Sequence, residues 1–357
     1  MFQERCSTQL IHRHAGAVTM SRLHPDQFSR TPRHTRAAAT GCMLRGVGSV
    51  SPPIPHHSLF KSVRASMLGT HLFGLYEKAL DAGDTWPVRL AKAQQLGFDF
   101  VEICIDEQDH RIDRLYQSDR EIAAFARTIA DAGVPIKSMC LSAHRRFPFG
   151  SADRQKREKA VDIMESAISF ACATGIRVIQ LAGYDVYYEP STQQSRDYLL
   201  EGLAWAAREA ERQQVMLAIE IMDTELINSM TRYLCYADQI QSPWLKAYPD
   251  LGNLTAWGND VDDELKKGIG EIVAVHVKDT KAVTPEFGGQ FKSVPFGAGC
   301  VDFVQCFSTL EDLRYSGPYL LEMWHQSGTD DVGTVASAKA FIDRQYAQSS
   351  QERSRRK

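Results

Sequence analysis

The stretch that decides the fold class is RVIQLAGYDVYYEPSTQQSRDYLLEGLAWAAREAERQQVMLAIEI, residues 177–221. It begins and ends with a short apolar run, RVIQLAG (177–183) and VMLAIEI (215–221). Between these runs, DYLLEGLAWAAREAERQQ (197–214) has the length and the apolar periodicity of an amphipathic helix. A buried strand, a helix and a second buried strand in this order are typical of a parallel α/β fold.

The same alternation continues in both directions, from Met67 to residue 347. The eight strand candidates are 71–76, 99–104, 136–142, 177–183, 215–221, 245–250, 271–277 and 318–324. Eight strands, each followed by a helix over a total of about 280 residues, predict a (β/α)8 TIM barrel, which typically has about 250 residues. A doubly wound open sheet is the alternative. It would more naturally place a Gly-rich phosphate turn after its first strand, and GLYEKALDAG (74–83) is not such a turn.

Residues 1–66 differ from the rest of the chain in composition. They contain eight Arg and one Lys against Glu4 and Asp26, a balance of +7, so the remaining residues sum to −10 in a chain of net charge −3. A segment rich in Arg, His, Ser, Thr and Pro buries too little apolar surface to fold. We therefore expect a disordered basic extension, either an organelle transit peptide or a leader or over-extended gene start before Met67. The barrel is expected at 67–347 and a disordered tail at 348–357.

The overall composition excludes several classes of protein. An acidic main body argues against general nucleic-acid binding. No apolar run approaches the roughly 20 residues of a membrane-spanning helix, so no membrane partner is expected. The eight cysteines form no CxxC pairs, which indicates thiols of a cytoplasmic protein.

Four consecutive strands end in an ionisable residue: Glu220, Asp250, His276 and Glu322. In a TIM barrel the carboxyl ends of all strands meet at one face, where the chemistry takes place. Ionisable groups gathered there would repel or desolvate one another without a cation. Carboxylates and an imidazole suit one divalent metal ion, with Mn²⁺ or Zn²⁺ favoured and Mg²⁺ or Co²⁺ as alternatives. Each residue taken alone could equally be structural.

Segments along most of the chain, from Leu72 to about Ala347, resemble the L-ribulose-5-phosphate 3-epimerases, also called L-xylulose-5-phosphate 3-epimerases. These are xylose-isomerase-like TIM barrels. The segments that carry the resemblance are AIEIMD, YPDLGN, AVHVKDTK, VPFGAGCVDF, YLLEMW, GLYEKAL, GFDFVEICIDE, MCLSAHRRFPFGS and GIRVIQLAGYDVYY. Residues 1–66 have no counterpart in that pattern.

The resemblance implies that Glu220, Asp250, His276 and Glu322 bind the metal and that the two glutamates form the acid/base pair. It also implies a ketopentose phosphate as substrate and a homodimer as the assembly. The chemistry agrees with these residues, because inverting the carbon beside a ketone needs a base on each face and an electrophile for the enediolate between them. Pentose or ascorbate catabolism is the expected setting.

Other polar residues near the strand ends are candidates for substrate binding. The loop SAHRRFPFG offers arginines that suit phosphate oxygens, although a solvated basic loop is an equal alternative. A turn at 297–299 could hold an anion with its backbone N–H groups. Glu102 is expected to orient His or Arg groups. The candidate substrate-binding residues are His144, Arg145, Arg146, Asn253, Lys278 and Lys281, with Lys292 on the same loop as Lys281.

Three other functions remain open at this point. A sibling sugar isomerase, a non-phosphorylated ketose 3-epimerase or an inosose dehydratase would use the same ligands. A repair endonuclease of the endonuclease IV kind would need more histidines than the five beyond residue 66. A catalytically silent sugar-binding barrel has no need for two intact glutamates.

Overall fold

The computed structural model describes residues 68–356, so the expected disordered extension at 1–66 lies outside the described residues. In the described part, every predicted strand is present and its bounds agree within a few residues. The strands are β1 (Phe73–Tyr76), β2 (Phe100–Ile105), β3 (Ile136–Leu141), β4 (Val178–Ala182), β5 (Met216–Glu220), β6 (Leu245–Tyr248), β7 (Val275–Val277) and β8 (Tyr319–Leu321).

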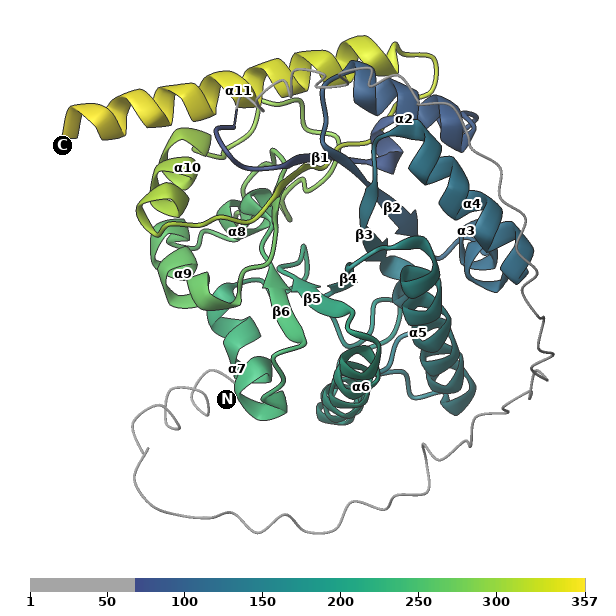
Figure 1. Cartoon of the computed structure of the whole chain (residues 1–357). Helices are drawn as coiled ribbons and strands as arrows, with labels where there is room; N and C mark the ends of the chain where they lie inside the picture. Colours follow the sequence, from purple (N-terminus) through teal and green to yellow (C-terminus); the bar gives the residue numbers. More distant parts are fainter. Residues whose placement is uncertain (1–67, 357) are drawn as a thin grey trace, which may run out of the picture. The chain divides into compact units, whose positions relative to one another are not determined.

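Helices follow the strands and surround them, as Figure 1 shows. They are α2 (Trp86–Gln95), α3 (Asp109–Ile112), α4 (Asp119–Ala132), α5 (Arg154–Thr174), α6 (Gln193–Gln213), α7 (Met230–Ile240), α8 (Leu251–Ala256), α9 (Val261–Gly268), α10 (Phe303–Asp312) and α11 (Asp331–Arg356). Short 3-10 turns are η2 (Glu77–Ala79), η3 (Asp113–Tyr116), η4 (Ser142–Arg145) and η5 (Ile269–Glu271). Among residues 68–356, no helix has both the length and the apolar character needed to cross a membrane.

The predicted disordered tail is wrong as far as the structure describes it, because α11 continues to Arg356. The end of this helix is tied to α10: the Arg353 guanidinium binds Asp312 at 2.8 Å and reaches Glu311 at 3.4 Å. These partners lie some forty residues away in the sequence. The polar composition of the tail, on which the prediction of disorder rested, does not reveal such contacts.

All strand pairs are parallel, and the order is β6-β5-β4-β3-β2-β1-β8-β7. Two isolated parallel bridges, Ala247 to Ile272 and Asp250 to His276, connect the chain at β6 with that at β7. The sheet therefore closes, and the predicted TIM barrel is confirmed.

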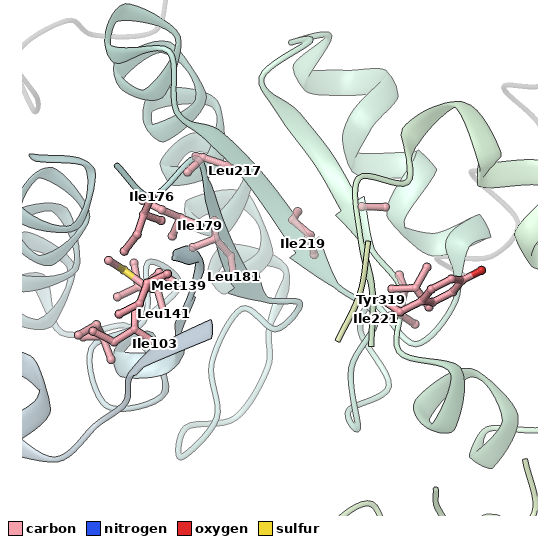
Figure 2. Close-up of a cluster of buried hydrophobic side chains, with 14 of the residues drawn as sticks. Ile103, Met139, Leu141, Ile176, Ile179, Leu181, Leu217, Ile219, Ile221 and Tyr319 are labelled. Atoms are coloured by element: carbon pink, nitrogen blue, oxygen red, sulfur yellow. The ribbon is translucent and has the colours of Figure 1, made fainter. Parts of the chain in front are cut away.

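Alternation along each strand divides the core into two parts. Outward-facing side chains pack between strands and helices, and Figure 2 shows part of this layer with Ile103, Met139 and Leu217. Inward-facing side chains form a smaller cluster that includes Phe100. A Cβ on Gly74 would lie 2.3 Å from the Phe100 ring, so the glycine makes room for this ring in the barrel interior. At the carboxyl ends of β5 to β8, ionisable residues take the inward-facing positions instead.

Candidate active site and metal centre

Glu220, Asp250, His276 and Glu322 meet at the carboxyl end of the barrel. Each offers one ligand atom, and these atoms all lie within 4.8 Å of one another. His276 Nδ1 is central: it lies 3.3 Å from Glu220 Oε1, 3.6 Å from Glu322 Oε2 and 3.8 Å from Asp250 Oδ2. All four side chains are buried.

The fold places each ligand through its position at a strand end. Glu220 is the last residue of β5 and faces inward because Ile219 faces the helices. Asp250 precedes α8 and caps it, since Oδ1 accepts the backbone N–H of Asn253 at 2.7 Å. Its other oxygen, Oδ2, is thereby left for the site. Glu322 directly follows β8.

The second nitrogen of His276 is held by Glu102, whose Oε1 lies 3.3 Å from Nε2. Tyr248 in turn donates its hydroxyl to Glu102 Oε2 at 3.3 Å. A carboxylate behind an imidazole fixes the ring orientation and leaves the other nitrogen for a metal. Glu102 thus stands where the sequence analysis expected it, against a histidine.

Lys278 lies beside the ligands on the same side of β7 as His276. Its Nζ is 3.0 Å from Asp250 Oδ2 and 2.9 Å from Glu322 Oε2. Neither oxygen accepts a hydrogen bond of good geometry, so both keep lone pairs for a further cation. Three carboxylates and one imidazole at this spacing fit a divalent ion.

The buried charges shift one another's titration. Burial raises the pKa of Glu220, and burial raises the pKa of Asp250 to about 7. Burial also disfavours ionised Glu322, but the nearby Lys278 and His276 outweigh it and lower the pKa of Glu322 to about 2. Gln180 donates its side-chain amide to Glu220 Oε2 and holds that carboxylate from the β4 side.

A pocket lies against this cluster. Its lining combines two carboxylates of the cluster, those of Glu220 and Glu322, with four cations. The lining residues are Tyr76, Lys78, Cys140, Ser142, Arg145, Ala182, Glu220, Met222, Asp223, Asn253, Lys278, Lys292, Glu322 and Trp324.

Three of the predicted substrate-binding residues line the pocket: Arg145, Asn253 and Lys278. The Arg145 guanidinium stacks over the Tyr187 ring at 4.5 Å. Asn253 donates its amide to Ile221 O at 2.8 Å, and its own Oδ1 is buried without a partner. Arg145 Nε and Asn253 Oδ1 thus have no hydrogen-bond partner among the described residues.

The other three predicted substrate-binding residues lie outside the pocket lining. His144 is buried, with Nε2 3.2 Å from Ala160 O and its ring 4.7 Å from that of Phe149. Arg146 turns away and pairs with Asp109 at 2.6 Å. Lys281 is exposed and forms a backbone bridge to Gln290. The turn of η4 explains why His144 and Arg146 lie outside the pocket while Arg145 lines it, because successive residues of a helical turn point in different directions.

Sequence reasoning did not select Tyr76, Lys78, Gln180 and Trp324. Gln180 carried a usable signal, since a polar residue inside RVIQLAG alternates with residues that face the helices. Lys78 follows the end of β1 by two residues and Trp324 follows the end of β8 by three, whereas Glu322 directly follows β8.

Comparison with known proteins identifies the family. Residues 90–345 match the family described as xylose isomerase-like TIM barrel. The L-ribulose-5-phosphate 3-epimerase UlaE of Escherichia coli is 51% identical over 274 residues, which cover 77% of this chain and 94% of that protein. A solved L-ribulose 3-epimerase matches with a TM-score of 0.64 at 20% identity, over 79% of this chain and 96% of that one. A D-psicose 3-epimerase solved in the presence of D-fructose matches with a TM-score of 0.61 at 18% identity, over 77% and 97%. The chain belongs to the xylose isomerase-like TIM barrel family and, within it, to the L-ribulose-5-phosphate 3-epimerases, which are isomerases.

Proposed function

We propose that this protein interconverts L-ribulose 5-phosphate and L-xylulose 5-phosphate by metal-dependent epimerisation at C3. The observation that carries the proposal is the buried cluster of Glu220, Asp250, His276 and Glu322 beside a pocket lined by cations. The 51% identical relative is named an L-ribulose-5-phosphate 3-epimerase, which supports epimerisation at C3.

Glu220 and Glu322 are the proposed acid/base pair. Glu220 ends β5 and Glu322 directly follows β8, so the two carboxylates reach the pocket from strands three positions apart around the barrel. One carboxylate removes the C3 proton, and the other returns a proton to the opposite face of the enediolate. Glu220, Asp250, His276 and Glu322 would hold a divalent ion, which would supply a Lewis acid for the negative charge that develops on the substrate. Gln180 and Lys278 hold Glu220 and Glu322 respectively, which keeps the two carboxylates in place.

A phosphorylated substrate agrees with the charges of the pocket. Lys78, Arg145 and Lys292 line it in addition to Lys278. The Arg145 Nε is buried without a hydrogen-bond partner. A dianionic phosphate can bind to these cations, whereas an uncharged ketose cannot use their charge. The solved relatives named for unphosphorylated sugars have 18–20% identity and support the fold alone.

The test is isotope exchange in D₂O. The protein is incubated with L-ribulose 5-phosphate, with and without EDTA, and the position of deuterium is read by NMR. We expect deuterium at C3 together with the epimer, and loss of both after chelation. Deuterium at C1 would indicate an aldose–ketose isomerase. Faster turnover of unphosphorylated L-ribulose would refute the phosphate assignment.

Four further expectations stay predictions: the identity of the metal, the homodimer, a cytoplasmic location and a role in pentose or ascorbate catabolism. Elemental analysis of the purified protein and its mass in solution measure the first two directly.

A further inference from the structure

The segment between β7 and α10 is a long loop whose two ends are joined by one carboxylate. Asp279, two residues after β7, accepts four backbone N–H groups. Oδ2 accepts from Gly297 at 2.8 Å and from Gly299 at 3.0 Å. Oδ1 accepts from Thr280 at 2.9 Å and from Val301 at 3.4 Å. The carboxylate is 2% exposed and thus fastens the returning end of the loop to the strand.

The turn at 297–299 is shaped around this carboxylate. A Cβ on Gly299 would lie 2.0 Å from Asp279 Oδ1 and 2.3 Å from Thr280 O, so only glycine permits the approach. From the sequence, these backbone N–H groups could hold an external anion. The structure instead gives them an internal one, because Gly297 and Gly299 donate to Asp279.

The joined loop carries Lys292 to the pocket. Lys292 lines the pocket, and its Nζ lies 5.8 Å from the centre of the Trp324 ring. The chain bends sharply beside it, since Ser293 has a φ of 56°, in the left-handed region that is uncommon for a residue with a Cβ. Next to this bend, Val294 is buried. A conformation of this kind persists only where the surrounding structure determines it.

We propose that Asp279 is a positioning residue for substrate binding: it closes the loop so that the ammonium of Lys292 stands at the pocket and binds the substrate. The inference rests on the proposed function for its kinetic test. Asp279 does not touch the pocket, so its effect on binding passes through Lys292.

The kinetic test is a double-mutant cycle with Asp279→Asn and Lys292→Met. Asparagine keeps the size of the side chain but replaces one acceptor oxygen with a donor that faces backbone N–H groups. We expect each single variant to raise KM about tenfold or more with little change in kcat, because an interaction with the bound substrate is lost. In the Lys292→Met background, Asp279→Asn should then have almost no further effect on KM. Full additivity, or an equal loss of kcat in both single variants, would overturn the proposal.

A second measurement needs no substrate. Limited proteolysis of the full-length, metal-loaded protein should cut Asp279→Asn within 281–300 much faster than wild type, while Lys292→Met stays resistant. Glu286→Gln is the matched control, as it removes an exposed carboxylate from the same loop, where Glu286 accepts a hydrogen bond from the nearby Thr284 hydroxyl. Equal cleavage of Asp279→Asn and the control would refute the loop closure. If the wild type does not turn over L-ribulose 5-phosphate but Asp279→Asn is cut faster, the proposed function fails and the loop closure stands.

Discussion

Replacing His144 by a residue that does not titrate should make the free energy of unfolding of the protein less dependent on pH. His144 was expected to bind substrate, but it is 7% exposed and packs against Phe149. Burial lowers the pKa of His144 to about 4, against an ordinary value of about 6.5. A bound phosphate would have the opposite effect, because an anion raises the pKa of an imidazole.

The sign of the effect follows from proton binding. Between about pH 6.5 and pH 4 the unfolded chain binds a proton at His144 that the folded protein does not. The stability from the neutral imidazole is therefore complete above about pH 6.5 and is lost as the pH falls toward 4. At about pH 5 the loss amounts to about 2 kcal/mol, from a pKa difference of about 2.5 at 1.36 kcal/mol per unit, less the part not yet titrated.

Urea denaturation of wild type and His144→Gln at about pH 7.5 and pH 5 measures this directly. The variant should be less stable at the higher pH, because it loses the ring packing, but its free energy of unfolding should fall by about 2 kcal/mol less on acidification. Comparing the two changes cancels the titration of all other groups. Parallel pH profiles for the two proteins would refute the assignment of His144 as a neutral packing residue.

Three further variants test the site and its support. Glu322→Gln should lower kcat by about a hundredfold or more while elemental analysis still finds most of the metal; full activity would exclude the proton-transfer role. Glu102→Gln should weaken metal binding by about 10–100-fold in a competition with a chromophoric chelator, because it disturbs the partner of His276; an unchanged affinity would show that the ring is oriented by other contacts. Glu77→Gln should destabilise the protein by about 3–5 kcal/mol in urea, since the fully buried carboxylate accepts hydrogen bonds from Arg89, Arg111 and Arg114; a loss below about 1 kcal/mol would contradict this role.

The fold could be predicted from the sequence because the information is local and repeated. Every strand run is short, apolar and bounded by polar residues, and a one-residue error at its ends does not move its inward face. The tail at 348–356 could not be predicted in the same way. Its helix is held by Arg353 against α10, and contacts between distant segments leave no periodic trace in a polar sequence.

In the candidate site, too, residues at strand ends could be predicted from the sequence better than residues on loops. The meeting of the four ionisable residues of the candidate metal centre could be predicted, because a strand fixes which side a residue at its end faces and the barrel fixes where all strand ends meet. Residues on loops could not, because neighbours such as Arg145 and Arg146 leave a helical turn in different directions. Only the first lines the pocket, while the second reaches Asp109. Asp279 follows the same rule: it stands next to Lys278 in the sequence, yet Lys278 faces the metal ligands and Asp279 faces its own loop. A run of charges after a strand therefore contains two kinds of residue, and strand alternation continued by one or two positions separates them.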